Sequence, residues 1–458
     1  MLTAPAPAAA RDPFMHELRA REFARLDRDG LAYLDYTGSA LYAERQLREH
    51  HALLASSVFA NPHSENAPSR ASSEIIAAAR AAVLRLFDAS SRDYVVAFTA
   101  NTSAAVKLVG ESFPFSSGSL LALSTDNHNS VIGMREFARR AGATVAYLPL
   151  DDDLRLDDPA PRLAELRARH GGDSLFAFPA QSNFSGVKHP LELVTLAQRL
   201  GFRVLLDAAA FAPSNPLSLA RHPADFVTVS FYKIFGYPTG VGALVARRDA
   251  LAALRRPWFA GGTIDFASVQ NDMFRLRDTV EAFEDGTPDF LSIAALSSGF
   301  ALYADVGIDR ITRHVGAHTA VALQGLTSLT HRDGSPLVRL YGPSTMDARG
   351  ATLTFNVLQR DGRIVPYTAV EARASDARVA VRCGCFCNPG ASERAFGFDP
   401  VRAGECMTAL RDAGFTIDRF AECLGGDTAV GAVRVSMGLA NNARDVERAI
   451  ELVASFGA

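Results

Sequence analysis

Short apolar runs alternate with helical patterns between residues 93 and 246, and five of these runs end in polar residues. The five are "YVVAFTANTSAA", "SLLALSTDNHNS", "SLFAFPAQSNFSG", "FRVLLDAAAF" and "DFVTVSFYK". Continuous apolar runs separated by helices are typical of a mostly parallel sheet covered on both faces. Because such sheets bind ligands at the carboxyl ends of their strands, we expect these polar residues to meet in one crevice.

The pattern changes after about residue 290, where the longer helical segments "LSIAALSSGFALYADVG" and "ARDVERAIELVASFG" mix with the short strands "ATLTFNVL" and "AVRVSMG". This mixture indicates a smaller α+β domain. We therefore predict an α/β fold in three parts. These are an N-terminal arm and helix packing on the small domain (1–29), a large α/β domain (30–290) and a small α+β domain (291–458).

Charge and hydropathy exclude several classes of partner. The 458 residues carry a formal net charge of -3, which gives no overall attraction to nucleic acid or to an anionic membrane. No apolar run approaches the roughly 20 residues of a membrane helix, and the start "MLTAPAPAAARDPF" lacks the pattern of a secretory signal. We expect a cytoplasmic enzyme acting on small molecules, with neither nucleic acid nor membrane as a partner.

The five cysteines do not form the pattern of a disulfide framework, so we expect reduced thiols. Three of them, Cys383, Cys385 and Cys387, alternate in "VRCGCFCNPG" and would lie on one side of an extended segment. A structural zinc site needs about four ligands, usually in two separated pairs, and no second pair is visible. We predict no metal. A buried inert cluster is one alternative, and a reactive thiol on a mobile loop is the favoured one.

Lysine is rare in this chain, since only Lys107, Lys188 and Lys233 occur among its 47 basic residues. Lys233 follows an apolar strand, and Asp207 ends the strand before it. A primary amine can form a Schiff base with an aldehyde cofactor, which a guanidinium cannot. A carboxylate beside a pyridine nitrogen keeps that nitrogen protonated. The pair indicates pyridoxal 5'-phosphate.

A phosphate needs hydrogen-bond donors, and "TANTSAAVKL" offers them where a strand leads into a helix. Thr102 and Ser103 would lie at the helix N-terminus, which attracts anions. Ser230, three residues before Lys233, could add a hydroxyl. An ordinary Ser/Thr helix cap is the alternative interpretation.

Four more residues have the right chemistry for the cofactor ring and the substrate. His128 follows a strand and could stack on the pyridine face, and Asn183 could donate to the ring oxygen. Arg382 and Arg434 could pair with a substrate carboxylate, because a guanidinium binds a carboxylate with two parallel hydrogen bonds.

Several motifs in order resemble one known group: "YLDYTGSALY", "DNHNSVIGMRE", "SNFSGVKHPL", "SFYKIFGYPTGVGALV", "FEDGTPDFLSI", "GCFCNPGA" and "VRVSMG". The chain resembles the fold-type I, class V aminotransferase superfamily, within it the cysteine desulfurases, and in particular the N-terminal domain of molybdenum cofactor sulfurases. The resemblance covers nearly the whole chain. It implies a large PLP-binding domain with a mostly parallel sheet and a small α+β domain carrying the cysteine loop.

The resemblance also implies a role for each matched residue. The cofactor residues would be Lys233 for the aldehyde, Asp207 for the pyridine nitrogen, His128 for the ring face, Asn183 for the ring oxygen, and Thr102, Ser103 and Ser230 for the phosphate. Thr287, in "FEDGT", would reach the phosphate of the neighbouring subunit, which implies a homodimer. Arg434 would bind the substrate carboxylate with help from Arg382, and Cys387 would carry the persulfide.

The expected activity is that of a cysteine desulfurase, which converts L-cysteine to alanine and leaves a persulfide on Cys387. The family's "NPGAC" is "NPGAS" here, with Ser392 in the last place. The C-terminal domain of the molybdenum cofactor branch is also not included in this sequence, so we expect a separate sulfur acceptor. Alternatives on the same scaffold are a C–S or C–Se lyase, an epimerase, an aminotransferase, or a PLP-binding protein without catalysis.

Overall fold

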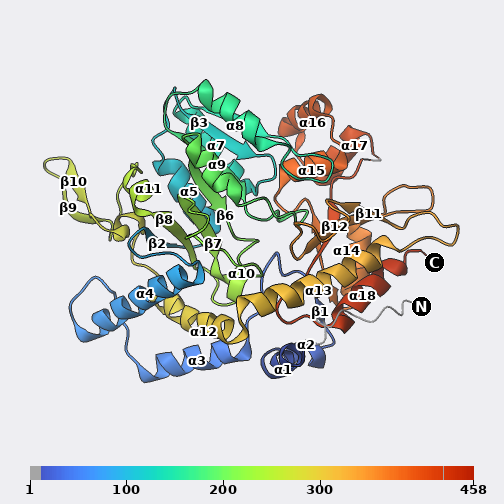
Figure 1. The fold of residues 1–458 in the computed structure, drawn as a ribbon, viewed down its shortest axis with the longest axis horizontal. Coiled ribbons are helices and arrows are strands. Elements are labelled where there is room, and N and C mark those ends of the chain that lie inside the picture. The colour runs from blue at the N-terminus through green and yellow to red at the C-terminus, as the bar shows by residue number, and fades with distance from the viewer. Residues whose placement is uncertain (1–11, 427, 458) are drawn as a thin grey trace.

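A seven-stranded sheet forms the centre of the computed structural model, which describes residues 12–426 and 428–457 (Figure 1). The strand order is β2-β8-β7-β6-β5-β3-β4. The strands are β2 (Tyr94–Thr99), β3 (Leu120–Ser124), β4 (Thr144–Leu148), β5 (Ser174–Pro179), β6 (Arg203–Asp207), β7 (Phe226–Ser230) and β8 (Gly242–Arg247). β8 runs antiparallel to both of its neighbours, and the other pairings are parallel. The predicted mostly parallel sheet is confirmed.

Both faces of this sheet are buried, which explains why its strands are continuous apolar runs. Alternate residues of β5 belong to two different hydrophobic clusters, with Phe176 and Phe178 in one and Leu175 and Ala177 in the other. Side chains alternate across a strand, so each cluster covers one face. Helices complete both cores. They include α4 (Ala67–Leu86), α5 (Thr102–Ser112), α7 (Met134–Arg140), α8 (Pro159–Ala168) and α9 (Glu192–Arg199).

A second, antiparallel sheet has the order β11-β12-β15-β14. Its strands are β11 (Val338–Tyr341), β12 (Thr352–Val357), β14 (Arg382–Gly384) and β15 (Ala432–Ser436), and it packs with α13 (Ile308–Thr327) and α14 (Tyr367–Asp376). The chain start joins this part, because β1 (Ala32–Tyr33) pairs with β13 (Val379–Ala380). In addition, Arg19 of α1 (Pro13–Glu22) lies 2.7 Å from Asp445 of α18 (Ala443–Ala454). The predicted domain boundaries stay a prediction.

The remaining elements connect or extend these two parts. They are α2 (Arg25–Arg28), α3 (Glu44–Ser56), α6 (Asn129–Ile132), α10 (Phe231–Phe235), α11 (Arg248–Ala252), β9 (Ile264–Ser268), β10 (Met273–Leu276), the 3-10 helix η2 (Val280–Phe283), α12 (Phe290–Val306), α15 (Pro389–Phe396), α16 (Pro400–Ala413) and α17 (Ile417–Leu424). Within the described ranges, no single helix is long and apolar enough to cross a membrane. α12 and α13 meet that criterion only together, as a pair bent by 75°.

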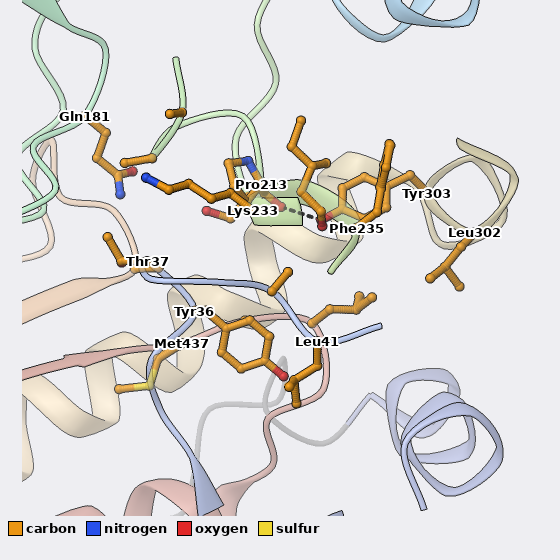
Figure 2. A pocket seen from close by; sticks show the side chains of 18 residues that line it. Tyr36, Thr37, Leu41, Gln181, Pro213, Lys233, Phe235, Leu302, Tyr303 and Met437 are labelled. Atoms are coloured by element: carbon orange, nitrogen blue, oxygen red, sulfur yellow. Dashed lines mark hydrogen bonds between the residues drawn. The ribbon is translucent and has the colours of Figure 1, made fainter. Parts of the chain in front are cut away.

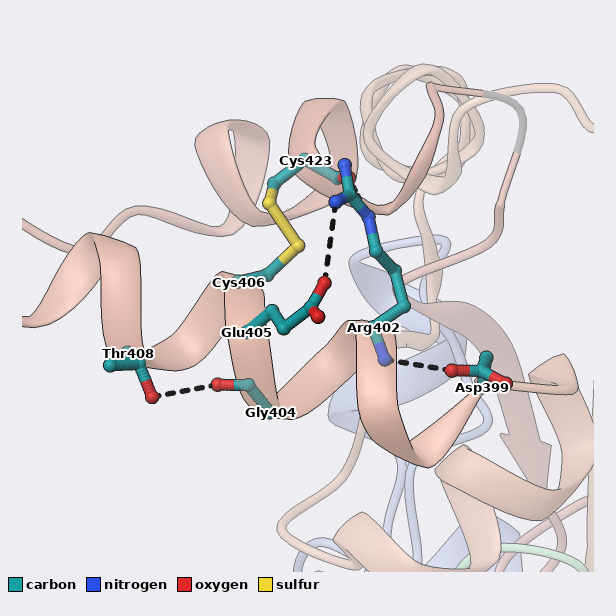
Figure 3. Close-up of a disulfide and its surroundings, with 7 residues drawn as sticks. All are labelled: Asp399, Arg402, Gly404, Glu405, Cys406, Thr408 and Cys423. Carbon is teal, nitrogen blue, oxygen red and sulfur yellow. Dashed lines mark hydrogen bonds and ion pairs between the residues drawn. A yellow bond between two sulfur atoms is a disulfide. The ribbon is translucent and has the colours of Figure 1, made fainter.

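The expectation that all thiols are reduced is wrong for one pair. Cys406 of α16 and Cys423 of α17 form a disulfide, with their Cα atoms 5.8 Å apart (Figure 3). The two cysteines are 17 residues apart in the sequence and meet because α16 and α17 pack against each other. The sequence spacing of Cys406 and Cys423 does not indicate this pairing, because only the packing of α16 against α17 brings the two residues together. Cys383, Cys385 and Cys387 are free.

Candidate active site

A cavity of about 190 Å³ lies where β5, β6 and β7 end and α5 begins. Seven residues predicted from the sequence line it: Thr102, Ser103, His128, Asn183, Asp207, Ser230 and Lys233. They come from segments spread over more than a hundred positions, and they meet because parallel strands end at the same edge of the sheet. Asn101, Ser130, Gln181 and Tyr232 also line the cavity and were not predicted to do so.

Lys233 lies on the short helix α10, directly after β7, and its half-buried side chain lines the cavity. Burial lowers the pKa of Lys233 below its ordinary value, against the opposing effect of Asp207. A lysine with a lowered pKa has a larger unprotonated share, which is the nucleophilic form. Figure 2 shows the side chain extending toward Gln181 above a second cavity, lined in part by Tyr36 and Thr37.

The N-terminus of α5 offers an anion site beside Lys233. Ser230 Oγ accepts a hydrogen bond from the Thr102 backbone N–H at 2.8 Å and lies 2.8 Å from Thr102 Oγ1. Ser103 Oγ lies 2.5 Å from Ser130 Oγ. Hydroxyls gathered at the start of an eleven-residue helix match the needs of a phosphate group.

His128 and Asp207 have the properties expected of neighbours of an aromatic cofactor. Burial lowers the pKa of His128, and the nearby Lys233 lowers it further, so the imidazole is held neutral. The ring is fixed because His128 Nδ1 accepts a hydrogen bond from the Ser130 N–H at 3.1 Å. Asp207 is buried, and its Oδ1 accepts from the Ala209 N–H at 3.0 Å. A neutral flat ring and a buried carboxylate fit a protonated pyridine.

The two predicted arginines are joined by a carboxylate that was not predicted. Arg382 and Arg434 stand opposite each other on β14 and β15. Asp35 accepts hydrogen bonds from Arg382 Nη2 at 2.6 Å and from Arg434 Nη2 at 3.1 Å. Burial lowers the pKa of Arg434 to about 10, whereas the hydrogen bond to Asp35 raises the pKa of Arg382. Asp35 therefore holds both guanidinium groups in place.

Cys387 is exposed and lies on a turn between β14 and α15. The preceding ring, Phe386, stacks under Arg434 with 4.7 Å between the guanidinium carbon and the ring centroid. Asn183 Nδ2 donates to the Phe386 carbonyl at 2.7 Å, and the Asn129 N–H donates to the Cys387 carbonyl at 2.8 Å. The structure thus brings the cysteine turn against the residues that line the Lys233 cavity.

Thr287 does not line this cavity within one protomer. It lies in a separate pocket with Lys107 and Glu111, and Asn61 Nδ2 donates to its hydroxyl at 3.2 Å. Among the residues that the structure describes, no group of three or more His, Cys, Asp or Glu side chains is arranged to hold a metal ion.

The unpredicted residues differ in how clearly the sequence indicates a functional role for them. Ser130 lies two residues after His128 in the same polar cluster, so its hydroxyl could have been included with the phosphate residues. Asp35 had no comparable signal, because its two partners lie about 350 and 400 residues away in the sequence.

Comparisons with known proteins identify the family of this chain. The family model described as "Aminotransferase class-V" matches residues 32–449. A molybdenum cofactor sulfurase from Arabidopsis thaliana is 36% identical over 479 residues, covering 96% of this chain and 58% of the relative. The human molybdenum cofactor sulfurase is 36% identical over 466 residues, with 96% of this chain and 51% of the relative covered. The chain thus spans little more than half the length of these relatives.

Solved structures share the fold at low sequence identity. The apo cysteine desulfurase from Thermococcus onnurineus NA1 has a TM-score of 0.78 and 23% identity, with 99% of each chain covered. A C-DES mutant with glycine covalently linked to its PLP cofactor has a TM-score of 0.70 and 17% identity, with 96% of this chain and 99% of that chain covered.

Proposed function

Because this chain belongs to the class V aminotransferase family, we propose that it is a pyridoxal-phosphate enzyme that takes sulfur from L-cysteine, releasing alanine and forming a persulfide on Cys387. One observation carries the proposal. A half-buried lysine with a lowered pKa lines the same cavity as the hydroxyls at the start of α5, and an exposed cysteine lies on the adjoining turn. Similarity to molybdenum cofactor sulfurases and to cysteine desulfurases supports it.

The cavity residues fit the cofactor by their chemistry. Lys233 would hold its aldehyde and Asp207 its ring nitrogen, with His128 against the ring and Asn183 at the ring oxygen. The phosphate would be held by Thr102, Ser103 and Ser230, with Ser130 as an additional hydroxyl. When bound, pyridoxal phosphate supplies an electron sink that stabilises negative charge at the substrate Cα.

The side chains around the cavity would each have a separate role in the reaction. The lowered pKa of Lys233 leaves its amine able to take the substrate Cα proton. Arg434, with Arg382 beside it, would orient the substrate carboxylate, which shares these guanidinium groups with Asp35. The neutral His128 would keep the ring covered without adding charge.

Sulfur transfer is assigned to Cys387. Its thiolate would form a bond to the substrate sulfur while the substrate C–S bond breaks. The electron pair of that bond goes to the substrate carbon, which takes up a proton and leaves as alanine. The second sulfur stays on Cys387 as a persulfide until a separate acceptor removes it.

A product analysis tests this proposal. Protein loaded with pyridoxal phosphate is incubated with L-cysteine, cystine and selenocysteine, and the carbon products and the mass of the Cys387 peptide are measured. We expect alanine and one added sulfur atom on that peptide. Pyruvate with ammonia would assign a lyase instead, a requirement for a keto acid would assign an aminotransferase, and a D-amino acid would assign an epimerase.

Two cysteine variants make the test specific. Cys387→Ser should bind the cofactor but release no alanine from L-cysteine. Cys383→Ser is the matched control, because burial raises the pKa of the Cys383 thiol to about 12 and keeps it protonated. Normal turnover by Cys387→Ser would remove the persulfide role from that residue.

We also propose that the enzyme is a homodimer. Thr287 lies outside the Lys233 cavity of its own protomer, as expected for a residue that serves the neighbouring site. The β9–β10 hairpin, which projects at the left of Figure 1, leaves large apolar side chains in solvent. Exposed apolar patches of this kind mark association surfaces.

A further inference from the structure

Asp126 is a fully buried carboxylate that lies two residues after the end of β3. It has no role in the proposed function described above. Its Oδ1 accepts hydrogen bonds from Ser182 Oγ at 2.8 Å and from Asn388 Nδ2 at 2.6 Å. His189 Nε2 lies 2.9 Å from its Oδ2. A buried carboxylate requires such donors, and these come from two other segments of the chain.

Asn388, the residue directly after Cys387, connects this carboxylate to the cysteine turn. Its Nδ2 also donates to Asn183 Oδ1 at 3.0 Å, and its Oδ1 caps α15 by accepting from the Ala391 N–H at 3.2 Å. A single buried amide side chain thus ties the turn to Asp126, to a residue lining the Lys233 cavity, and to the following helix.

The turn needs such support because its backbone is strained. Phe386 and Cys387 both have φ of 57°, a left-handed conformation that is unfavourable for residues with a Cβ and persists only where neighbouring contacts enforce it. The contact with the Asp126 segment is also close. A Cβ on Gly390 would lie 2.2 Å from the carbonyl oxygen of Thr125, so only glycine lets α15 approach the residue before Asp126.

We propose that Asp126 is a positioning residue for sulfur transfer, and that it holds Cys387 at the Lys233 cavity through Asn388. This inference rests on the proposed function. Without the carboxylate, the short hydrogen bond from the Asn388 amide weakens, and the strained turn is held less firmly. The affected step is the attack of Cys387 on the substrate sulfur, whereas cofactor and substrate binding depend on other residues.

Asp126→Asn tests the proposal, because it keeps the shape but puts a neutral amide oxygen in place of the carboxylate that accepts from Asn388, and a hydrogen bond to a neutral acceptor is roughly half as strong. We expect unchanged cofactor absorbance near 400 nm, a KM for L-cysteine within twofold of wild type, and a kcat per bound cofactor at least tenfold lower. Asp225→Asn is the matched control. Asp225 is equally buried and accepts from the Val204 N–H and Gln198 Nε2, both at 2.9 Å, at the opposite end of the sheet. Its kcat per bound cofactor should stay within twofold of wild type.

Asn388→Ser separates positioning from helix capping, because serine also caps a helix but cannot reach Asp126 with an amide. It should reproduce the loss in kcat. His189→Gln, which retains a donor toward Asp126, should keep more activity than His189→Leu. Equal kcat in Asp126→Asn and wild type would overturn the proposal, and so would loss of the cofactor in both Asp126→Asn and Asn388→Ser, which assigns a structural role only.

A second readout uses the cofactor-free protein and does not depend on the proposed function. Backbone amides in the peptide covering residues 383–392 should exchange hydrogen at least tenfold faster in Asp126→Asn and Asn388→Ser than in wild type or Asp225→Asn. Identical exchange in all four proteins would refute the positioning role even if wild type forms the persulfide. Faster exchange in the two variants of a protein that forms no persulfide would instead support the positioning role of Asp126 and refute only the proposed reaction.

Discussion

At the scale of single residues, Lys233 combines a chemical requirement with a cost in stability. Its pKa is lowered by burial, so the unfolded chain holds its proton more tightly than the folded protein at neutral pH. Lys233 therefore lowers the stability of the folded protein at pH values below the ordinary lysine pKa. This cost disappears as the pH rises toward that value. Lys233→Met should make the cofactor-free protein more stable at neutral pH, measured by its thermal midpoint.

The same variant should lose all covalent attachment of pyridoxal phosphate by borohydride, and its turnover of cysteine should fall by at least about a thousandfold. Lys107→Met is the comparison, since Lys107 is an exposed lysine paired with Glu111 at 2.8 Å. Lys107→Met should have the thermal midpoint of wild type, and borohydride should still attach pyridoxal phosphate to it. If borohydride still attached the cofactor to Lys233→Met, the attachment site would be another amine.

How far the site could be predicted depends on the kind of contact each residue makes. Thr102, His128, Asp207 and Lys233 follow predicted strands, and the geometry of parallel sheets places such residues together. Asp35 acts by pairing with two arginines on distant strands, and no local pattern encodes a pairing of that range. Local periodicity thus predicts positions along a sheet edge, and contacts between the sheet and the small domain need the structure.

At the scale of single elements, α13 carries a histidine pair that predicts acid sensitivity. His314 and His318 are buried one turn apart with their ring centroids 4.6 Å apart. Burial, reinforced by His314 and Arg19, lowers the pKa of His318 to about 3. Below the ordinary histidine pKa the unfolded chain gains a proton that the folded protein cannot take up, so stability falls as the pH drops from about 6.5 toward 3.

The stability lost by this group between pH 7 and pH 5 is roughly 2 kcal/mol. His318→Leu should remove about that much of the pH dependence of the free energy of unfolding, measured by urea titration at both pH values. His51→Leu, which changes an exposed histidine on α3, is the matched control variant. An equal slope in His318→Leu and wild type would show that the histidine is not buried in its neutral form.

At this scale, the sequence predicts which segments form buried strands, but it does not predict their direction or how the helices pair. The buried strands were predictable, because continuous apolar runs follow from burial on both faces. The reversed direction of β8 was not, because an apolar run carries no information on its direction in the sheet. The pairing of Cys406 with Cys423 depends on the angle between α16 and α17, which the turn between them sets and which neither helix reveals alone.

At the scale of the whole molecule, the exposed apolar side chains of the β9–β10 hairpin predict self-association. Phe266, Val269 and Met273 are 62%, 99% and 66% exposed, which a monomer in water rarely tolerates on one projecting hairpin. The double variant Phe266→Glu, Met273→Glu should run as a monomer where wild type runs as a dimer, by light scattering after gel filtration. A monomeric wild type would contradict this.

Association matters for catalysis if Thr287 completes the neighbouring site, and mixed dimers test that dependence. A lost hydrogen bond to a charged phosphate weakens cofactor binding by roughly tenfold or more, so Thr287→Val alone should be impaired and Lys233→Ala alone inactive. In a dimer of one Thr287→Val chain and one Lys233→Ala chain, the site with an intact Lys233 receives an intact Thr287 from its partner. Such a mixed dimer should therefore regain close to half of the wild-type activity at limiting cofactor. If Thr287 acted within its own protomer, the site with an intact Lys233 would keep its defect, and mixing would restore nothing.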